Sequence, residues 1–421
     1  IRRTPKSTLF PYTTLFRSTI IVVEHDLDII RKADYLIDIG PKAGNLGGEV
    51  VFEGNFSEMP LLENSLTSQY IKGSKSIKIN PNRNEGNGFI ITLVEPKKNN
   101  LRINRVTFPL GCIVLVTGVS GSGKSSLIYE VLYKTLKRFD KGYNGETDSH
   151  NIIYGGEHID FIELVDQSPI GKSSRSTPAT YTKSFDPIRD IFASTQAAKQ
   201  MGWKAGHFSF NVPGGRCDVC EGEGIVTVDM QFLPDVHLEC EACKGTRFKK
   251  EARDILYKGK SIVDVLNMTV DEAYEFFNDT PKVTRKLKVL QDVGLGYLLL
   301  GQPSSMLSGG EAQRIKLASH LDLDTDNIGL FLFDEPTTGL HLEDISKLIE
   351  CFRRINKAGH SIIIIEHNIH VIASADWIID LGPGAGENGG RVIATGTPET
   401  IAKNPESFTG KALSDFFNIS Y

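Results

Sequence analysis

A glycine-rich loop between an apolar strand and a helix constrains the fold of this chain most. Residues 112–117 read CIVLVT, a buried-strand pattern, and lead into GVSGSGKS at 118–125. The apolar residues that follow recur at helical spacing, at Leu127, Ile128, Val131, Leu132 and Leu136. Strand, loop and helix stand in the order that a phosphate-binding loop requires, with the anion at the helix N-terminus. We therefore predict an α/β fold built around this loop.

The residues of the loop have different expected roles. The glycines let backbone N–H groups close around phosphate oxygens, Lys124 supplies a cation for the β- and γ-phosphates of ATP, and Ser125 offers an oxygen to Mg²⁺. A chance glycine-rich turn is the alternative, which the strand and helix on either side disfavour. The predicted ATP and Mg²⁺ ligands here are Gly118, Ser120, Gly121, Ser122, Gly123, Lys124, Ser125 and Ser126.

Two adjacent carboxylates follow a second apolar strand. Residues 330–333 read LFLF, and Asp334 and Glu335 come next, at the exposed C-terminal end of that strand. We expect Asp334 to hold the Mg²⁺ shell and Glu335 to polarise the attacking water as a general base. Adjacent acids at a strand end are often only a solvated loop. Here PTTGLH at 336–341 follows directly, and it fits the pattern of ATP-binding-cassette (ABC) ATPases.

A helix that is predicted to begin with two glycines precedes these carboxylates in the sequence. Residues 307–318 read LSGGEAQRIKLA and resemble the ABC signature motif. A serine cap, free N–H groups and the positive end of a helix dipole suit the binding of a phosphate. In that family the motif completes the ATP site of an opposing unit. The predicted phosphate-binding residues are Ser308, Gly309, Gly310 and Glu311.

Two further polar residues follow predicted strands. His367, after IIII at 362–365 and Glu366, is expected to sense the γ-phosphate. Gln167, after residues 161–166, is expected to couple the nucleotide to a neighbouring domain. A lone histidine at a strand end is more often structural, so the functional interpretation depends on the order of the whole set of motifs.

The chain contains an internal repeat. Thr19–Gly54 reappears without a gap at Ser361–Gly396, with 17 of 36 positions identical. Each copy is predicted to form an Ile/Val strand, a Glu-His pair, a helix, a second strand ending in Asp-x-Gly-Pro and a Gly-Gly turn. The first copy has no phosphate loop ahead of it. We therefore expect a parent protein with two tandem ATPase units, of which this chain begins near the end of the first.

The repeat and the changes in composition give six predicted segments. Residues 1–18 match nothing ahead of the second copy, so we interpret them as a foreign leader, with a divergent natural segment as the alternative. Residues 73–88 are polar and aperiodic and predict a linker. The remaining segments are the end of the first unit (19–72), the first part of the second unit (89–168), an insertion domain (169–306) and the rest of the second unit (307–421).

The insertion contains two Cys-x-x-Cys pairs. Cys217 and Cys220 are separated from Cys240 and Cys243 by 19 residues, a spacing within the range for a four-thiolate zinc site at 217–243. Four protein ligands leave no open position, so Zn²⁺ would be structural. Disulfide pairing is the alternative, which a reducing compartment disfavours.

Charge is distributed unevenly around these cysteines. Residues 171–216 hold seven Lys or Arg against two acids, whereas residues 217–243 hold seven acids and neither Lys nor Arg. We therefore expect any DNA-phosphate contact to come from the flanks of the zinc segment. Aromatic residues interleaved with the first flank could stack on bases or pack internally, and packing is favoured. The candidate DNA contacts are Lys172, Arg175, Lys183, Arg189, Arg216, Lys244 and Arg247.

Composition excludes little beyond this. A formal net charge of −5 argues against a uniformly basic coat, although a basic face can lie within an acidic total. The longest apolar runs have strand length, well below the roughly 20 residues that cross a bilayer. We expect no membrane span, no secretory signal and a location in the cytoplasm.

Together these motifs resemble those of the UvrA family, the damage-sensing ATPases of bacterial nucleotide excision repair. The resemblance covers residues 19 to about 405 and rests on GVSGSGKSSL, QSPIGKSSRSTPATYT, HFSFNVPGGRCDVCEGEG, FLPDV, CKGTRF, LSGGEAQRIKLA, DEPTTGLH and ADWIIDLGP. It implies an ATP-driven homodimer that binds duplex DNA, senses bulky lesions and loads UvrB. The UvrB-binding insertion of that family has no counterpart in this chain, so UvrB loading is expected of the intact protein.

Two other interpretations share some of these features. The ATPase subunit of a membrane transporter would carry every nucleotide motif, but the four cysteines argue against it. An inactive zinc-containing remnant would carry the cysteines without turning over ATP.

Overall fold

The structure is a computed structural model that describes residues 19–41, 47–62, 65–137, 151–171, 173–228, 230, 236–321 and 327–420. The chain forms two compact units, and the described residues divide between them after Lys75. The expected leader, 1–18, and the DNA candidate Lys172 lie outside the described residues. In the part of the chain that is described, every helix is too short or too polar to cross a bilayer.

The smaller unit contains the first copy of the repeat. Strands β1 (Leu36–Gly40) and β2 (Glu49–Gly54) pair in antiparallel register with an irregularity between Asp38 and Ile39. Short helices complete the unit: α2 (Leu27–Ile30), η3 (Met59–Leu61) and α3 (Leu66–Lys72).

The strand predicted ahead of the first Glu-His pair is absent, so that prediction was wrong. Residues 19–26 have no regular secondary structure, and Ile21 and Val23 are 90% and 99% exposed. The sheet of this unit has only two strands, β1 and β2, among the described residues. A parallel strand depends on neighbours to bond its backbone and cover its faces, and an apolar run has no strand preference strong enough to replace them.

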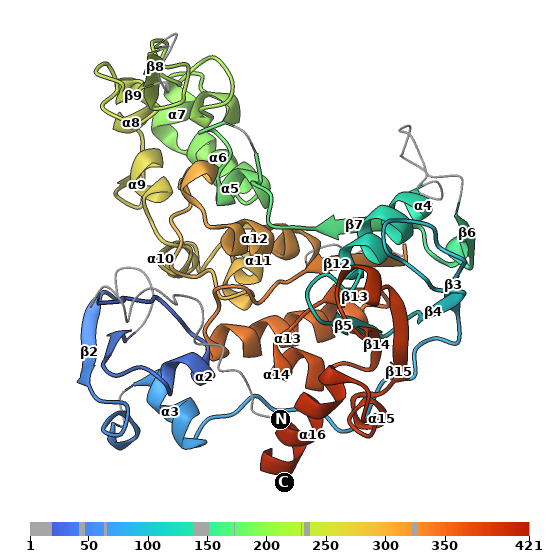
Figure 1. The fold of residues 1–421 in the computed structure, drawn as a ribbon. Helices are drawn as coiled ribbons and strands as arrows, with labels where there is room; N and C mark the ends of the chain where they lie inside the picture. Colours follow the sequence, from blue (N-terminus) through green and yellow to red (C-terminus); the bar gives the residue numbers. More distant parts are fainter. Residues whose placement is uncertain are drawn as a thin grey trace. The chain divides into compact units, whose positions relative to one another are not determined.

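A six-stranded sheet forms the centre of the larger unit (Figure 1). The order is β15-β14-β5-β13-β12-β7, and all neighbours are parallel except β14 and β15. The strands are β5 (Ile113–Gly118), β7 (Phe161–Val165), β12 (Gly329–Asp334), β13 (Ser361–Ile365), β14 (Trp377–Gly382) and β15 (Arg391–Gly396). Because β5, β12 and β13 are parallel neighbours, the phosphate loop and both polar strand ends lie at one edge of the sheet.

Helices cover both faces of this sheet, as an α/β fold requires. On one face Leu127 and Val131 of the π-helix η4 (Ser126–Tyr133) join a core with Val114 and Leu332. On the other, Phe333 meets Phe352 of α13 (Leu342–Lys357), with ring centroids 4.9 Å apart. The remaining helical segments near the sheet are α4 (Lys134–Leu136), η6 (Gly156–His158), α14 (Ile369–Ala373), η9 (Gly386–Asn388), α15 (Pro398–Ile401) and α16 (Phe408–Ser420).

A small antiparallel sheet extends the same core. Its order is β4-β3-β6, with β3 (Ile90–Val94), β4 (Arg105–Pro109) and β6 (Ile152–Tyr154). Alternate residues, including Leu93, Phe108 and Ile153, point into the core. The loop between β3 and β4 reaches the phosphate loop, where the Asn99 side chain donates to Ser126 Oγ at 2.8 Å.

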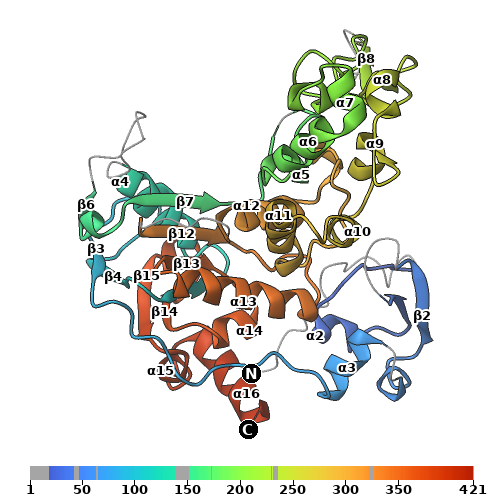
Figure 2. The same ribbon diagram turned by 180° about the vertical axis from the view of Figure 1, so that it is seen from behind.

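A largely helical insertion separates β7 from β12, and Figure 2 shows it from behind. It contains the β8–β9 hairpin near the cysteines and α12, which carries the signature-like motif. Its elements are α5 (Pro178–Tyr181), α6 (Phe185–Ser194), α7 (Gln196–Gln200), η7 (Ala205–Phe208), β8 (Ile225–Val228), β9 (Val236–Glu239), α8 (Lys250–Asp254), β10 (Leu256–Tyr257), β11 (Lys260–Ser261), α9 (Ile262–Leu266), α10 (Val270–Phe276), α11 (Pro281–Asp292), η8 (Ser304–Met306) and α12 (Gly309–Leu321).

The segment predicted as a linker is partly fixed to the larger unit. Arg83 forms an ion pair with Glu399 and donates to the carbonyl oxygen of Ala375 at 2.9 Å. The N–H of Asn84 donates to Asp376 at 3.1 Å. Polar, aperiodic composition predicts the absence of an apolar face, but specific ion pairs and hydrogen bonds can still fix such a segment.

Candidate nucleotide site and cysteine cluster

The phosphate loop closes tightly at the end of β5. Gly118 has a φ of +130°, and a Cβ there would lie 2.0 Å from the carbonyl oxygen of Leu381, so only glycine fits. The Lys124 ammonium donates to the carbonyl oxygens of Gly118 at 2.9 Å and Val119 at 3.0 Å, and so reaches back across the loop. Burial lowers the pKa of Lys124, although the carboxylates of Glu335 and Asp334 act in the opposite direction.

The serines of the loop differ in exposure. Ser122 is buried, and its Oγ has no hydrogen-bond partner among the described residues. Ser120 and Ser125 are exposed beside it, as is Gly121. A buried hydroxyl without a partner is uncommon in native structures and suits a site where a polar ligand binds.

The two carboxylates, His367 and Gln167 lie together at the C-terminal ends of β12, β13 and β7. Glu335 Oε1 lies 3.3 Å from His367 Nε2. The Gln167 amide donates to the carbonyl oxygen of Glu335 at 3.3 Å. Glu335 has a φ of +42°, a left-handed conformation that few non-glycine residues adopt and that recurs at functional sites.

Asp334 differs from Glu335 in its surroundings. Burial raises the pKa of Asp334, the nearby Tyr129 hydroxyl lowers it, and the charge of Glu335 raises it again. Burial also raises the pKa of Tyr129, so this hydroxyl stays protonated. It has no well-formed hydrogen bond to a described residue. Tyr129 could not be predicted as a site residue, because its approach to Asp334 depends on the course of η4.

The start of α12 is capped by its own side chains. Ser308 Oγ accepts from the N–H of Glu311 at 3.2 Å, and Glu311 accepts from the N–H of Ser308 at 2.7 Å. The hydroxyl of Tyr297 also donates to Glu311 at 2.7 Å. The serine cap expected from the sequence is therefore present, and Glu311 completes a reciprocal cap with it. Gly309 and Gly310 lie between the capped positions, next to Gln167 and Thr338.

Two residues of α12 that sequence reasoning missed connect this helix to the strand ends. The buried Gln313 amide donates to the carbonyl oxygens of Val165 at 2.8 Å and Asp334 at 3.1 Å. Lys316 forms an ion pair with Asp166, next to Gln167. Both residues stand within LSGGEAQRIKLA, but their partners could not be assigned before β7 and β12 were known to be neighbours.

The four cysteines form one buried cluster, with all four sulfurs within 4.8 Å of one another. Cys217 and Cys240 Sγ are 3.9 Å apart, and Cys220 and Cys243 Sγ are 3.6 Å apart. Disulfide sulfurs lie about 2.05 Å apart, whereas tetrahedral Zn–S bonds of about 2.3 Å place sulfurs about 3.8 Å apart. The donor set and its spacing therefore fit Zn²⁺ and exclude the disulfide alternative.

Backbone groups turn toward the sulfurs. The N–H of Gly224 donates to Cys220 Sγ at 3.3 Å. Hydrogen bonds from the N–H groups of Cys243 and Ala242 lower the pKa of Cys240 to about 7, while burial raises that of Cys243 to about 12. A bound cation would favour the thiolate form at all four positions.

Three of the candidate DNA contacts already form ion pairs within the chain. Arg175, Arg189 and Arg216 form ion pairs with Glu223, Asp186 and Glu221 respectively. Arg247 is only 8% exposed and lies in the interior, so its prediction as a surface contact was wrong. Lys183 and Lys244 are exposed and form no ion pair with the described residues.

The aromatic residues of the basic flank mostly pack internally. Phe185, Phe208 and Phe210 are at most 2% exposed. The rings of Phe185 and Phe210 stack with centroids 5.3 Å apart. These side chains therefore pack in the apolar interior of the insertion, because the burial of large aromatic rings stabilises the fold.

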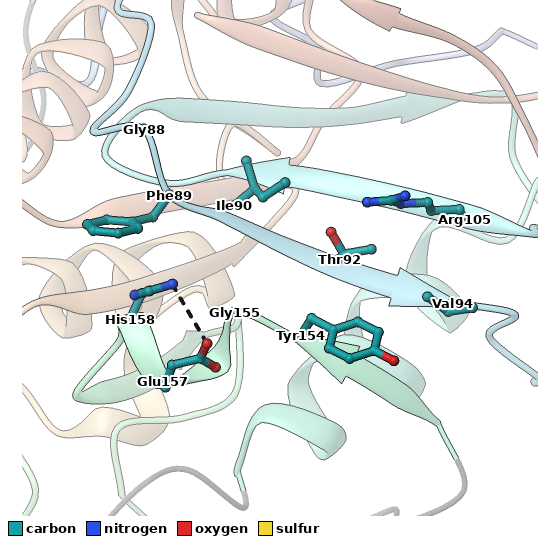
Figure 3. Close-up of a pocket in the computed structure, with 10 residues that line it drawn as sticks. All are labelled: Gly88, Phe89, Ile90, Thr92, Val94, Arg105, Tyr154, Gly155, Glu157 and His158. Atoms are coloured by element: carbon teal, nitrogen blue, oxygen red, sulfur yellow. Dashed lines mark ion pairs between the residues drawn. The ribbon is translucent and has the colours of Figure 1, made fainter.

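One cavity lies away from all the predicted site residues. It has a volume of about 470 Å³ and lies over the outward face of the β4-β3-β6 sheet. Figure 3 shows Phe89 facing His158, with ring centroids 4.1 Å apart, and Tyr154 and Arg105 further along the sheet. No nucleotide-binding candidate contributes to its lining.

The parallel sheet, the phosphate loop on its central strand and the glycine-opened helix after a long insertion are those of the ABC-type P-loop ATPase fold. UvrABC system protein A from Clostridium perfringens is 52% identical over 95% of this chain and 42% of its own length. The protein of the same name from Aquifex aeolicus is also 52% identical, over 95% of this chain and 43% of its own length.

A solved structure agrees with these relatives. The crystal structure of UvrA2 from Deinococcus radiodurans superposes with a TM-score of 0.86 and 44% identity, over 93% of this chain and 47% of that one. No protein-family model matches the chain. The chain is thus similar to UvrA proteins over nearly its whole length, and it spans less than half the length of these relatives.

Proposed function

We propose that this chain supplies an ATP-hydrolysing unit of a nucleotide excision repair subunit that binds damaged DNA. The observation that carries the proposal is the 52% identity with UvrABC system protein A over 95% of the chain. The gathering of Glu335, His367 and Gln167 at the end of the phosphate-loop sheet supports the ATPase part.

In this proposal the residues around the phosphate loop divide the work of hydrolysis. The loop N–H groups and the Lys124 ammonium would bind the phosphates, and Ser125 and Asp334 would hold Mg²⁺, which would neutralise charge on the phosphates. The Ser122 and Tyr129 hydroxyls have no well-formed hydrogen bond to a described residue, so they could bond to the ligands or their water. Ser120, Gly121, Gly123 and Ser126 complete the predicted set.

Glu335 would act as the general base. Its carboxylate would take a proton from the attacking water, and His367 at 3.3 Å would orient that carboxylate and bond to the γ-phosphate. Ser308, Gly309 and Gly310 would face the nucleotide of an opposing unit, with Glu311 and Gln313 holding their helix in place. Hydrolysis would then require a pair of units, supplied by the longer protein or by a homodimer.

Zn²⁺ would be held by Cys217, Cys220, Cys240 and Cys243 and would stabilise the insertion without entering the chemistry. Lys183 and Lys244 are the proposed DNA-phosphate contacts because they are the exposed candidates without an ion pair to a described residue. Duplex DNA with lesions would be the ligand, UvrB a partner of the intact protein, and the cytoplasm the location.

The test combines ATP turnover with DNA binding by the full chain. The wild type should hydrolyse ATP, and Glu335→Gln should reduce turnover by about 100-fold or more while nucleotide binding persists. Affinity for duplex DNA should fall as salt rises, with a shallower dependence in a Lys183→Gln, Lys244→Gln double variant. Turnover unaffected by Glu335→Gln would refute the assigned base. Zinc-loaded protein without salt-sensitive DNA affinity would refute the DNA-binding role.

A further inference from the structure

Arg247 is a buried cation that forms no ion pair with a carboxylate among the described residues. Its side chain is 8% exposed, and its Nη1 atom has no hydrogen-bond partner in the described part of the chain. The guanidinium lies over the Phe210 ring, 5.1 Å from the centroid. Burying an unpaired guanidinium is strongly unfavourable, so a native structure that does so normally provides a compensating negative charge.

The groups that act on this guanidinium electrostatically are Cys220, Glu223 and Cys243. Glu223 already forms an ion pair with Arg175, at 3.5 Å, and its side chain is 32% exposed. Its carboxylate is therefore shared and screened by solvent. The two cysteines, in contrast, belong to the buried four-sulfur cluster.

The backbone of Arg247 also connects the two halves of the cluster. Its carbonyl oxygen accepts from the N–H of Cys217 at 2.9 Å, and its own N–H bonds to the sulfur of Cys243. Gly224 approaches so closely that a Cβ there would lie 3.1 Å from Arg247 Cγ. The position of the guanidinium is thus set by the same turns that set the cysteines.

We propose that Arg247 is the buried counter-charge of a tetrathiolate metal centre, and that it sets how tightly the cluster holds Zn²⁺. The inference rests on the proposed zinc site. Four neutral thiols carry no charge and could not compensate a buried guanidinium, whereas Zn²⁺ with four thiolates has a net charge of −2. Arg247 neutralises half of that charge from inside the module, where solvent cannot.

The test measures Zn²⁺ affinity of the full chain by competition with a chromogenic chelator, after metal analysis of the wild type. Arg247→Met removes the charge with little loss of volume and should weaken Zn²⁺ binding about 10- to 100-fold. Arg247→Lys keeps the charge and should stay within about threefold of the wild type. Lys244→Met is the matched control, because it removes an equal charge next to Cys243 from an exposed position.

Each outcome decides between distinct statements. If the wild-type protein contains no zinc, the proposed zinc site is refuted. This outcome is distinct from a result that refutes only the role of Arg247. If the wild type binds zinc but Arg247→Met and Lys244→Met have equal Zn²⁺ affinities, Arg247 is not the counter-charge of the metal centre. If Arg247→Met does not fold, Arg247→Gln replaces it, and equal affinities of the Lys and Gln variants would overturn the proposal.

Discussion

The two copies of the repeat share nearly half of their residues, yet their strands meet different surroundings. In the second copy, Ser361–Ile365 is fully buried between β5 and β12. In the first copy, the matching residues 19–23 form no strand and are exposed. The hairpins are the same in both: β1–β2 and β14–β15 each have a register irregularity directly after the central aspartate. Local sequence is therefore sufficient for the hairpin, whereas the parallel strand depends on its neighbours.

The similarity extends further than the aligned sequence. Asp38 accepts from Ser65 and Thr67, and Asp380 accepts from Ser407 and Thr409, 342 positions later in each case. In both copies the serine also caps the following turn. The aligned repeat ends at Gly54, and in the segments that follow little besides this serine and threonine is identical between the copies. A matched pair of variants can test each aspect of the comparison.

The largest expected effect concerns the buried strand. Ile363 is 1% exposed, and Ile363→Ala should lower the local free energy of unfolding by about 3 kcal/mol through lost contacts and a cavity. Ile21→Ala, at the matching exposed position, should change it by less than about 0.5 kcal/mol. Hydrogen exchange measured on peptides of each copy reports both values. Equal losses would mean that residues 19–23 are buried in solution.

The second effect concerns the Glu-His pairs. His367 lies beside Glu335, whereas His25 lies beside its own neighbour, Glu24. His367→Ala should reduce the rate of ATP turnover about 100-fold, as expected for loss of a group that stabilises the transition state. His25→Ala should leave turnover unchanged. Steady-state turnover with a nucleotide-binding control distinguishes the two, and a comparable loss in His25→Ala would contradict the assignment.

The third effect concerns the central aspartates. Asp380 is buried and accepts from the hydroxyls of Thr117, Ser407 and Thr409 at 2.6–2.8 Å. Asp380→Asn should cost about 2 kcal/mol, since charge-assisted hydrogen bonds are lost where water cannot replace them. Asp38→Asn should cost about 1 kcal/mol, because Asp38 is only partly buried. Hydrogen exchange of β14 and of β1 provides the comparison, and a larger loss at Asp38 would contradict it.

The smallest effect depends on pH. Burial lowers the pKa of His370, while the matching residue of the first copy is the exposed Asp28. Below the ordinary histidine pKa of about 6.5, the unfolded chain binds a proton that the partly buried His370 resists. The second copy should therefore lose stability as pH falls below that value, and His370→Gln should remove part of this loss. An unchanged pH profile in the variant would show that His370 is not buried in solution.

The sequence predicted the α/β fold, the order of the nucleotide motifs and the cysteine cluster, because each depends on spacing within a short segment. GVSGSGKS needs only its own glycines and the flanking strand and helix to form a phosphate loop. The two Cys-x-x-Cys pairs likewise predicted a cluster whose sulfurs the structure brings within 4.8 Å. The matching hairpins of the repeat belong to the same category.

Only the tertiary structure decided features that depend on partners far away in the sequence. It left residues 19–23 exposed, buried Arg247 beside the cysteines and joined Gln313 to the ends of two strands. A positive charge in a sequence does not reveal whether its side chain meets water, a carboxylate or a cluster of sulfurs. Burial and charge compensation are set by the whole packed chain, which is why the hairpins could be predicted and the role of Arg247 could not.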